Sequence, residues 1–245
     1  MGEMIQVLAD QPIDAYLAKP ESKPRGSIIV IHEVWGLTDH IKSIADSFSK
    51  EGYLALAPDL LSDVDFSSVD IATLQMQLFD PKSRSEAQPK LRALMAPMQD
   101  PSFGAKTTAK LQASFNYLYD LPESQQKVSV CGFCFGGTYS FSLATVEPRL
   151  KIALPFYGHS DQSVEELKNI TCKVRAFYGE KDENLMNSLD DLKSRMREAG
   201  VDFEVKIYPD CGHAFFNDTN PNTYSSEAAS DAWQIVKKDL FEATL

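Results

Sequence analysis

The clearest candidate for chemistry is Cys134, which lies in a Gly-x-Cys-x-Gly pattern between a short apolar run and a helical pattern. The run 127–131 predicts a β-strand, and the segment 138–145 predicts a helix. A nucleophile at such a turn occupies a strained backbone position that only small neighbours tolerate, and Gly132 and Gly136 supply that room. The positive end of the following helix favours a thiolate over a thiol. We therefore expect a nucleophile at Cys134, with a buried structural cysteine as the alternative.

A thiol nucleophile needs a base, and the chain has four histidines. A strand–nucleophile–helix turn is typical of α/β-hydrolases, in which the acid and then the base follow the nucleophile, the base after the last strand. Only His213, which follows the apolar run Phe203–Tyr208, satisfies that order. The acid should follow the preceding run, 174–178. Asp182 is the preferred candidate because it would orient the imidazole from that loop, and Glu183 is the alternative.

The elements that must position these residues alternate between short apolar runs and helical patterns. Nearly continuous apolar runs are typical of strands covered on both faces. Their alternation with helices predicts one α/β domain over residues 1–245, with a mostly parallel sheet and helices on both faces. The ligand crevice of such a sheet lies beyond the carboxyl ends of its strands. The predicted strands are 4–8 and Ile13–Ala18, which form an antiparallel hairpin, then Ser27–Ile31, 53–58, 127–131, 152–157, 174–178 and Phe203–Tyr208, and the predicted helices are 41–51, 105–119, 138–145, 188–199 and 226–241.

Residues 61–101 interrupt this alternation. They show no strand pattern, and prolines at positions 81, 89, 97 and 101 predict that any helix there is cut into short pieces. The segment is a candidate for a partial cap over a pocket. The alternative is that its apolar residues only attach it to the body of the domain.

The overall composition limits the classes of partner. The chain has 24 Lys and Arg against 35 Asp and Glu, a formal net charge of −11. A surface this acidic repels nucleic-acid phosphates and anionic membranes, so we expect neither partner. The apolar runs are too short to span a bilayer. The N-terminal residues lack a signal-peptide pattern, and four cysteines do not form a disulfide framework, so we expect a reduced, cytoplasmic protein.

Cys131 and Cys134 also form a Cys-x-x-Cys spacing, which occurs in redox and metal sites. However, Cys131 belongs to the end of the predicted strand and Cys134 to the turn, so the two do not open one helix. No second Cys or His pair with zinc-ligand spacing lies nearby. We therefore expect no metal and no cofactor. A thiol oxidoreductase is the alternative, and it predicts that Cys131→Ser would abolish activity.

Four motifs of the chain carry a family resemblance. They are Ile31-His32-Glu33-Val34-Trp35-Gly36-Leu37, Gly132-Phe133-Cys134-Phe135-Gly136-Gly137, Gly179-Glu180-Lys181-Asp182 and Gly212-His213-Ala214-Phe215-Phe216-Asn217-Asp218. Together they resemble the dienelactone hydrolase (carboxymethylenebutenolidase) family, from about Met4 to the end of the last helix. The resemblance implies the α/β-hydrolase fold. It also implies a Cys–His–Asp triad at Cys134, His213 and Asp182 that cleaves an ester or lactone bond.

The resemblance assigns further residues to the site. The matching glutamate of the family contacts the thiol and helps to deprotonate it, which implies this role for Glu33. A carboxylate at a strand end would also be desolvated and so able to take a proton. The backbone N–H groups of Val34 and Phe135 would form the oxyanion hole. Trp35 and Tyr139 are candidates for pocket lining, with core packing as the alternative for each.

The chain departs from the family shortly after His213. Characterised members hold a substrate carboxylate with arginines, one of them in this neighbourhood, where this chain has Asn217 beside the acidic Asp218. No spacing assigns Arg84 or Arg92 as replacements. We expect a small-molecule ester or lactone hydrolase that forms a thioester, with Asn217 as a candidate substrate contact, in a monomer or homodimer. The alternatives are a general carboxylesterase or thioesterase, and a non-catalytic ligand-binding homologue.

Overall fold

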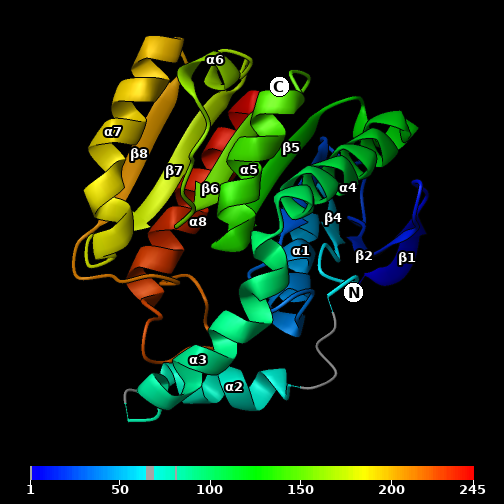
Figure 1. Ribbon diagram of the computed structural model, residues 1–245. Coiled ribbons are helices and arrows are strands. Elements are labelled where there is room, and N and C mark those ends of the chain that lie inside the picture. The colour runs from blue at the N-terminus through cyan, green and yellow to red at the C-terminus, as the bar shows by residue number, and fades with distance from the viewer. Residues whose placement is uncertain (1, 65–68, 81) are drawn as a thin grey trace.

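The computed structural model describes residues 2–64, 69–80 and 82–245, and these residues form an eight-stranded sheet with the order β1-β2-β4-β3-β5-β6-β7-β8 (Figure 1). β1 and β2 form an antiparallel hairpin, and β2 also runs antiparallel to β4. From β4 to β8 every neighbouring pair is parallel. The hairpin and the mostly parallel sheet are therefore confirmed. The strands are Glu3–Val7 (β1), Ile13–Ala18 (β2), Ser27–Ile31 (β3), Leu54–Pro58 (β4), Val128–Phe133 (β5), Ile152–Phe156 (β6), Lys173–Gly179 (β7) and Phe203–Tyr208 (β8).

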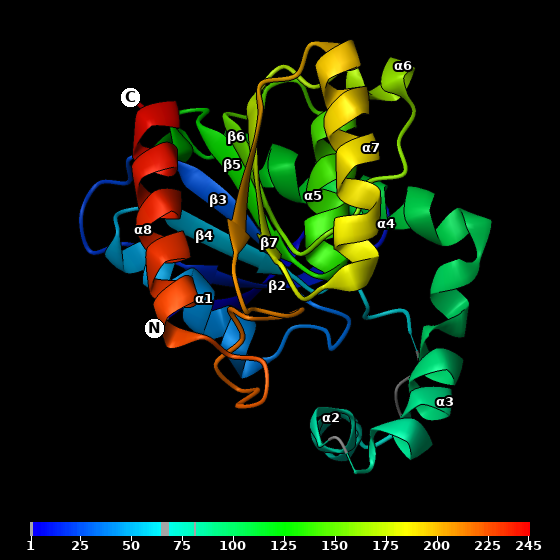
Figure 2. The same ribbon diagram turned by 90° about the vertical axis from the view of Figure 1, so that its left-hand side faces the viewer.

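Helices cover both faces of the sheet, as Figure 2 shows from the side. The alternation of side chains along β3 explains its continuous apolar sequence, because Ile28 and Val30 join one core cluster and Ile29 and Ile31 join the other. α1 and α8 contribute to the first cluster, and α4, α5 and α7 contribute to the second. The helices are Asp39–Lys50 (α1), Ile71–Phe79 (α2), Arg84–Met95 (α3), Pro101–Asp120 (α4), Phe135–Val146 (α5), Val164–Leu167 (α6), Glu183–Ala199 (α7) and Ser226–Ala243 (α8), with short 3₁₀ turns at Ala96–Gln99 and Pro122–Ser124.

Four helices begin earlier than the sequence pattern predicts, α1 by two residues and α4, α5 and α7 by three to five. α4 starts at Pro101, and the side chain of Asp100 accepts a hydrogen bond from the backbone N–H of Ser102. Proline suits the first helical position because its missing N–H would have no partner there. α5 and α7 begin directly at Phe135 and Glu183. Apolar periodicity does not detect these first turns, because they contain glycine, proline or polar residues in place of a repeated apolar stripe.

The segment between β4 and α4 contains two helices, and the expectation that prolines would cut them was wrong for α3. Pro89 lies inside α3, which loses one backbone hydrogen bond and continues. α2 and α3 pack on each other below the carboxyl edge of the sheet (Figures 1 and 2). Leu74, Ala87 and Leu94 form a cluster that is separate from the two main clusters. The buried residues of the α2–α3 unit therefore pack mainly on one another.

None of the helices in the described part of the chain is both long enough and apolar enough to cross a membrane.

Candidate active site

The parallel strands bring five chemically capable side chains to one edge of the sheet. Glu33 follows β3, Cys134 follows β5, Tyr157 follows β6, Asp182 lies three residues after β7, and His213 lies in the loop after β8. Residues that follow parallel strands meet at the carboxyl edge, which is the usual place for a ligand crevice. The predicted residues Cys134, Asp182 and His213 are thus found at one edge.

Cys134 occupies the strained turn that the sequence predicts. Its φ and ψ are 55° and −110°, and it precedes the first residue of α5. A Cβ at Gly132 would lie 2.0 Å from the backbone oxygen of Gly136, and a Cβ at Gly136 would lie 2.3 Å from that of Ile31. Only glycine permits these approaches. Cys134 is half-buried, whereas the other three cysteines, which are also free, are buried.

His213 and Asp182 form the closest contact of the site, with 2.5 Å between Nδ1 and Oδ2. Asp182 is buried and the His213 side chain is half-exposed. Desolvation lowers the pKa of His213, but its interactions with the Cys134 sulfur and with Asp182 outweigh that effect. The pKa of His213 is therefore well above its ordinary value. Glu183, the alternative acid, is exposed at the start of α7.

Glu33 is almost fully enclosed at the end of β3. Burial raises its pKa to about 7, while a hydrogen bond from Asn217, the charge of His213 and the Tyr157 hydroxyl oppose that rise. Asn217 donates from Nδ2 to Oε2 of Glu33 at 2.6 Å. The Asn217 oxygen accepts hydrogen bonds from the backbone N–H and the hydroxyl of Thr219. Both ends of the Asn217 amide therefore have protein partners.

Two polar residues near the Asn217–Glu33 contact, Asp218 and His32, have other partners. Asp218 lies 2.8 Å from Nδ1 of His40 on α1, so its charge is directed to that pair. His32 uses both ring nitrogens for backbone contacts, donating to the oxygen of Glu33 at 2.6 Å and accepting from the N–H of Leu60 at 3.0 Å. Burial lowers the pKa of His32. We conclude that His32 joins the ends of β3 and β4 as a neutral ring.

Two backbone N–H groups at this edge are available as donors. The N–H groups of Val34 and Phe135 make no hydrogen bond within the described residues. Trp35 is partly buried in the loop after β3. Tyr139 packs against Phe135, with ring centroids 4.6 Å apart.

Tyr157 is a site residue that the sequence analysis missed. It has a φ of 38°, its side chain is 1% exposed, and its ring centroid lies 5.0 Å from that of His213. Its hydroxyl faces Glu33 but completes no hydrogen bond within the described part of the chain. The sequence did carry a signal, because Tyr157 directly follows an apolar run. However, the predicted strand 152–157 includes Tyr157, so that prediction gives no reason to place its side chain in the site.

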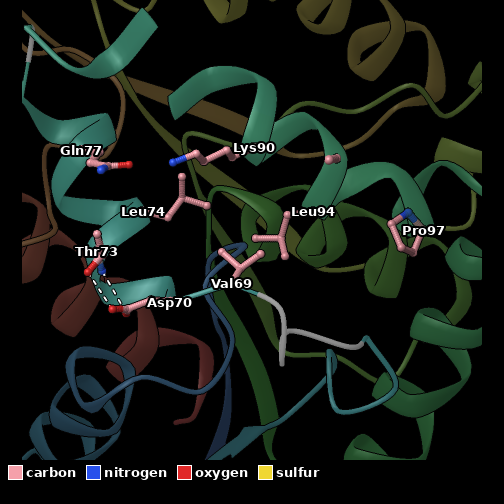
Figure 3. Close-up of a pocket in the computed structure, with 9 residues that line it drawn as sticks. Val69, Asp70, Thr73, Leu74, Gln77, Lys90, Leu94 and Pro97 are labelled. Carbon is pink, nitrogen blue, oxygen red and sulfur yellow. Dashed lines mark hydrogen bonds between the residues drawn. The ribbon is translucent and has the colours of Figure 1, made fainter. Parts of the chain in front are cut away.

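Other candidate sites lie apart from this edge. Cys131 is buried inside β5, where burial raises the pKa of its thiol. Within residues 2–64, 69–80 and 82–245, no three Cys, His, Asp or Glu side chains are grouped as a metal site would require. A cavity of about 500 Å³ lies between α2 and α3. Figure 3 shows Leu74 and Leu94 among the residues that line it. This cavity does not contain Cys134 or its neighbours.

Comparisons with known proteins identify the family of the chain and agree with its fold. The model of the dienelactone hydrolase family matches residues 13–245. A protein of Saccharolobus solfataricus, provisionally named carboxymethylenebutenolidase, is 35% identical over 244 residues, which cover 93% of each chain. A Klebsiella pneumoniae structure, provisionally named dienelactone hydrolase, has a TM-score of 0.81 at 23% identity and covers 98% of each chain. A dienelactone hydrolase-like promiscuous phosphotriesterase from metagenomic libraries has a TM-score of 0.77 at 22% identity, covering 99% of this chain and 98% of its own.

Proposed function

This chain belongs to the dienelactone hydrolase family of ester-bond hydrolases, and from that premise we propose that it cleaves its substrate with a triad of Cys134, His213 and Asp182. One observation carries the proposal. A half-buried cysteine on a strained turn at a helix N-terminus shares its sheet edge with a histidine that is hydrogen-bonded to a buried aspartate. This is the set of groups that activates a thiol nucleophile.

The acylation step uses Cys134 and the two free backbone donors. The Cys134 thiolate attacks the carbonyl carbon, and the N–H groups of Val34 and Phe135 bind the oxyanion that forms. The carbon–oxygen bond then breaks, and the alcohol or ring oxygen leaves with the bonding electron pair and takes a proton from the His213 imidazolium, which makes His213 neutral for the next step. Glu33 is the group that receives the thiol proton beforehand, and its enclosed carboxyl group suits that role because it holds a proton near neutral pH.

The deacylation step uses His213 and Asp182. His213 takes a proton from a water molecule, whose oxygen attacks the thioester carbonyl, and Asp182 orients the imidazole and stabilises its charged form. The acid is released and Cys134 is restored. No step requires a metal or an organic cofactor. The substrate is a small activated ester or lactone, such as an enol lactone, whose leaving group departs readily.

A general carboxylesterase is the second candidate, and the contact of Asn217 favours it. The amide is bonded to Glu33 and Thr219 and carries no charge, so it offers no cation to a substrate carboxylate. Such an enzyme would prefer simple uncharged esters over carboxylated lactones. All four cysteines are free, which supports the reducing, cytoplasmic setting expected from the sequence.

The test compares the wild type with Cys134→Ala on a dienelactone, followed by its ultraviolet absorbance, and on p-nitrophenyl acetate. We expect at least a 10³-fold loss of kcat/KM in the alanine variant, on the order found when a nucleophile is removed. Acid quenching of the wild type should leave an acyl group on the peptide that contains Cys134. The matched control Cys131→Ser should remain active. Unchanged turnover in Cys134→Ala would refute the proposal, and loss of turnover in Cys131→Ser would favour thiol redox chemistry.

A further inference from the structure

Two uncharged side chains converge on the Glu33 carboxyl group from distant parts of the chain. Asn217, in the loop after β8, donates a hydrogen bond to Oε2 at 2.6 Å. Tyr157, directly after β6, faces the same carboxyl group with its hydroxyl. Glu33, Asn217 and Tyr157 are 4%, 2% and 1% exposed, so solvent does not compete for these contacts.

The placement of Tyr157 is costly for stability. A non-glycine residue with a φ of 38° is strained. A buried hydroxyl without a hydrogen bond also loses its hydrogen bonds to water, and no protein partner replaces them within the described residues. Asn217 is also held in one orientation. Its oxygen accepts two hydrogen bonds from Thr219, so its NH₂ group is the end that meets Glu33. The Asn217 amide N–H group is therefore directed at the carboxyl group, and the Tyr157 hydroxyl faces that group without completing a hydrogen bond in the described part of the chain.

This deduction rests on the mechanism proposed above. We propose that Asn217 and Tyr157 are positioning residues that favour the carboxylate form of Glu33 through uncharged donors, and so set how readily Glu33 takes the proton of Cys134. In that transfer the Sγ–H bond breaks, the proton goes to an oxygen of Glu33, and the electron pair stays on sulfur as the thiolate. If the hydrogen bonds to the Glu33 carboxylate are weakened, Glu33 keeps its proton up to a higher pH. The sulfur then ionises beside a neutral acid and not beside a negative charge.

The charged neighbours of Glu33 explain why uncharged donors matter. His213 faces Glu33 from the loop after β8 and Tyr157 faces it from the end of β6, while Cys134, in the turn after β5, and Cys131, on β5, act on Tyr157. Cys131 is buried and its pKa is raised, so it remains a neutral thiol. A cation in place of Asn217 would stabilise the carboxylate much more strongly. With an amide, the pKa of Glu33 stays at about 7, where both protonation states are accessible.

The test measures the rate at which iodoacetamide alkylates Cys134 between pH 6 and pH 9, by mass spectrometry of the peptide that contains it. The buried cysteines serve as internal references. In Asn217→Leu we expect the pKa of Cys134 to fall by about one pH unit, since its competitor for the proton is strengthened. Tyr157→Phe should shift it in the same direction by a smaller amount. In a Glu33→Gln background neither substitution should change the profile further.

The matched control is Tyr53→Phe, which removes another buried hydroxyl, one that contacts Thr244. Its alkylation profile should equal that of the wild type. The proposal is overturned if both variants leave the profile unchanged or if their shifts persist without Glu33. Slower alkylation in Tyr157→Phe would assign that hydroxyl to the sulfur and overturn its role. Thermal unfolding verifies that each variant folds, and Tyr157→Phe, which keeps the ring, tests the proposal if Asn217→Leu does not.

Alkylation does not depend on ester turnover. If the wild type cleaves no ester but the two substitutions shift the alkylation profile as expected, the proposed function alone is refuted. If the wild type cleaves esters but neither variant shifts the alkylation profile, the positioning role alone is refuted.

Discussion

At the scale of single residues, Glu33 gives the protein a pH-dependent stability. Its pKa is about 7 in the folded chain against an ordinary value of 4.5, so the folded state keeps the proton where the unfolded state has lost it. The free energy of unfolding therefore falls as the pH rises from 4.5 to 7, and the loss persists above that range. Glu33→Gln removes the ionisation. The free energy of unfolding of Glu33→Gln minus that of the wild type should increase by about 2 kcal/mol between pH 5.5 and pH 8, measured by urea unfolding.

Glu183→Gln is the matched control for this prediction, because Glu183 is exposed. Its stability relative to the wild type should not change with pH over the same range. A Glu33→Gln variant with an equal advantage at both pH values would show that Glu33 does not titrate as an enclosed acid.

At the scale of elements, the close approach of α5 to β3 positions the two N–H groups that we propose as oxyanion donors, those of Val34 and Phe135. A Cβ at Gly136 would lie 2.3 Å from the Ile31 backbone oxygen, so Gly136→Ala must separate the two elements. We expect a loss of about 2–3 kcal/mol in the free energy of unfolding, measured in urea. Turnover should also fall, because the N–H groups of Val34 and Phe135 would no longer converge on one oxygen.

Gly104 in α4 offers the opposite case. A Cβ there would meet the Tyr139 hydroxyl at 3.8 Å, an ordinary contact. Gly104→Ala should therefore stabilise the protein by about 0.5–1 kcal/mol through helix propensity. If both glycine variants had the same effect, the close approach at Gly136 would not be what requires glycine.

At the scale of the whole molecule, the α2–α3 unit has its own small cluster of buried residues. Leu74→Ala removes the centre of that cluster and leaves the two main clusters intact. We expect faster amide hydrogen exchange across α2 and α3, with the midpoint of global thermal unfolding unchanged within about 1 °C. Leu118→Ala, in the main cluster under α4, should instead reduce global stability by about 2–5 kcal/mol. A large fall in the global midpoint of Leu74→Ala would show that the unit unfolds with the body.

The sequence by itself determined the eight strands, five of the helices and the residue types of the candidate site, but not α2, α3 and α6. Apolar runs predicted the strands because burial on both faces requires continuous apolar side chains. The glycines at 132 and 136 predicted the turn at Cys134, although only the close approach of Gly132 is to near neighbours in the chain, Gly136 and Ser140, and that of Gly136 is to the distant Ile31. Chain order selected His213 and Asp182, and the structure places them in contact. Their catalytic roles stay predictions.

Only the tertiary structure decided which distant groups face each other. Asn217 and Glu33 are 184 residues apart, and they meet because the sheet brings the loops after β3 and β8 to one edge. The sequence placed Asn217 beside a substrate and Tyr157 inside a strand, since neither residue carries a local pattern that names its partner. Strand order and the packing of helices on both faces fix these contacts. Propensity and periodicity depend only on residues that are close along the chain, so neither can specify a contact between distant loops.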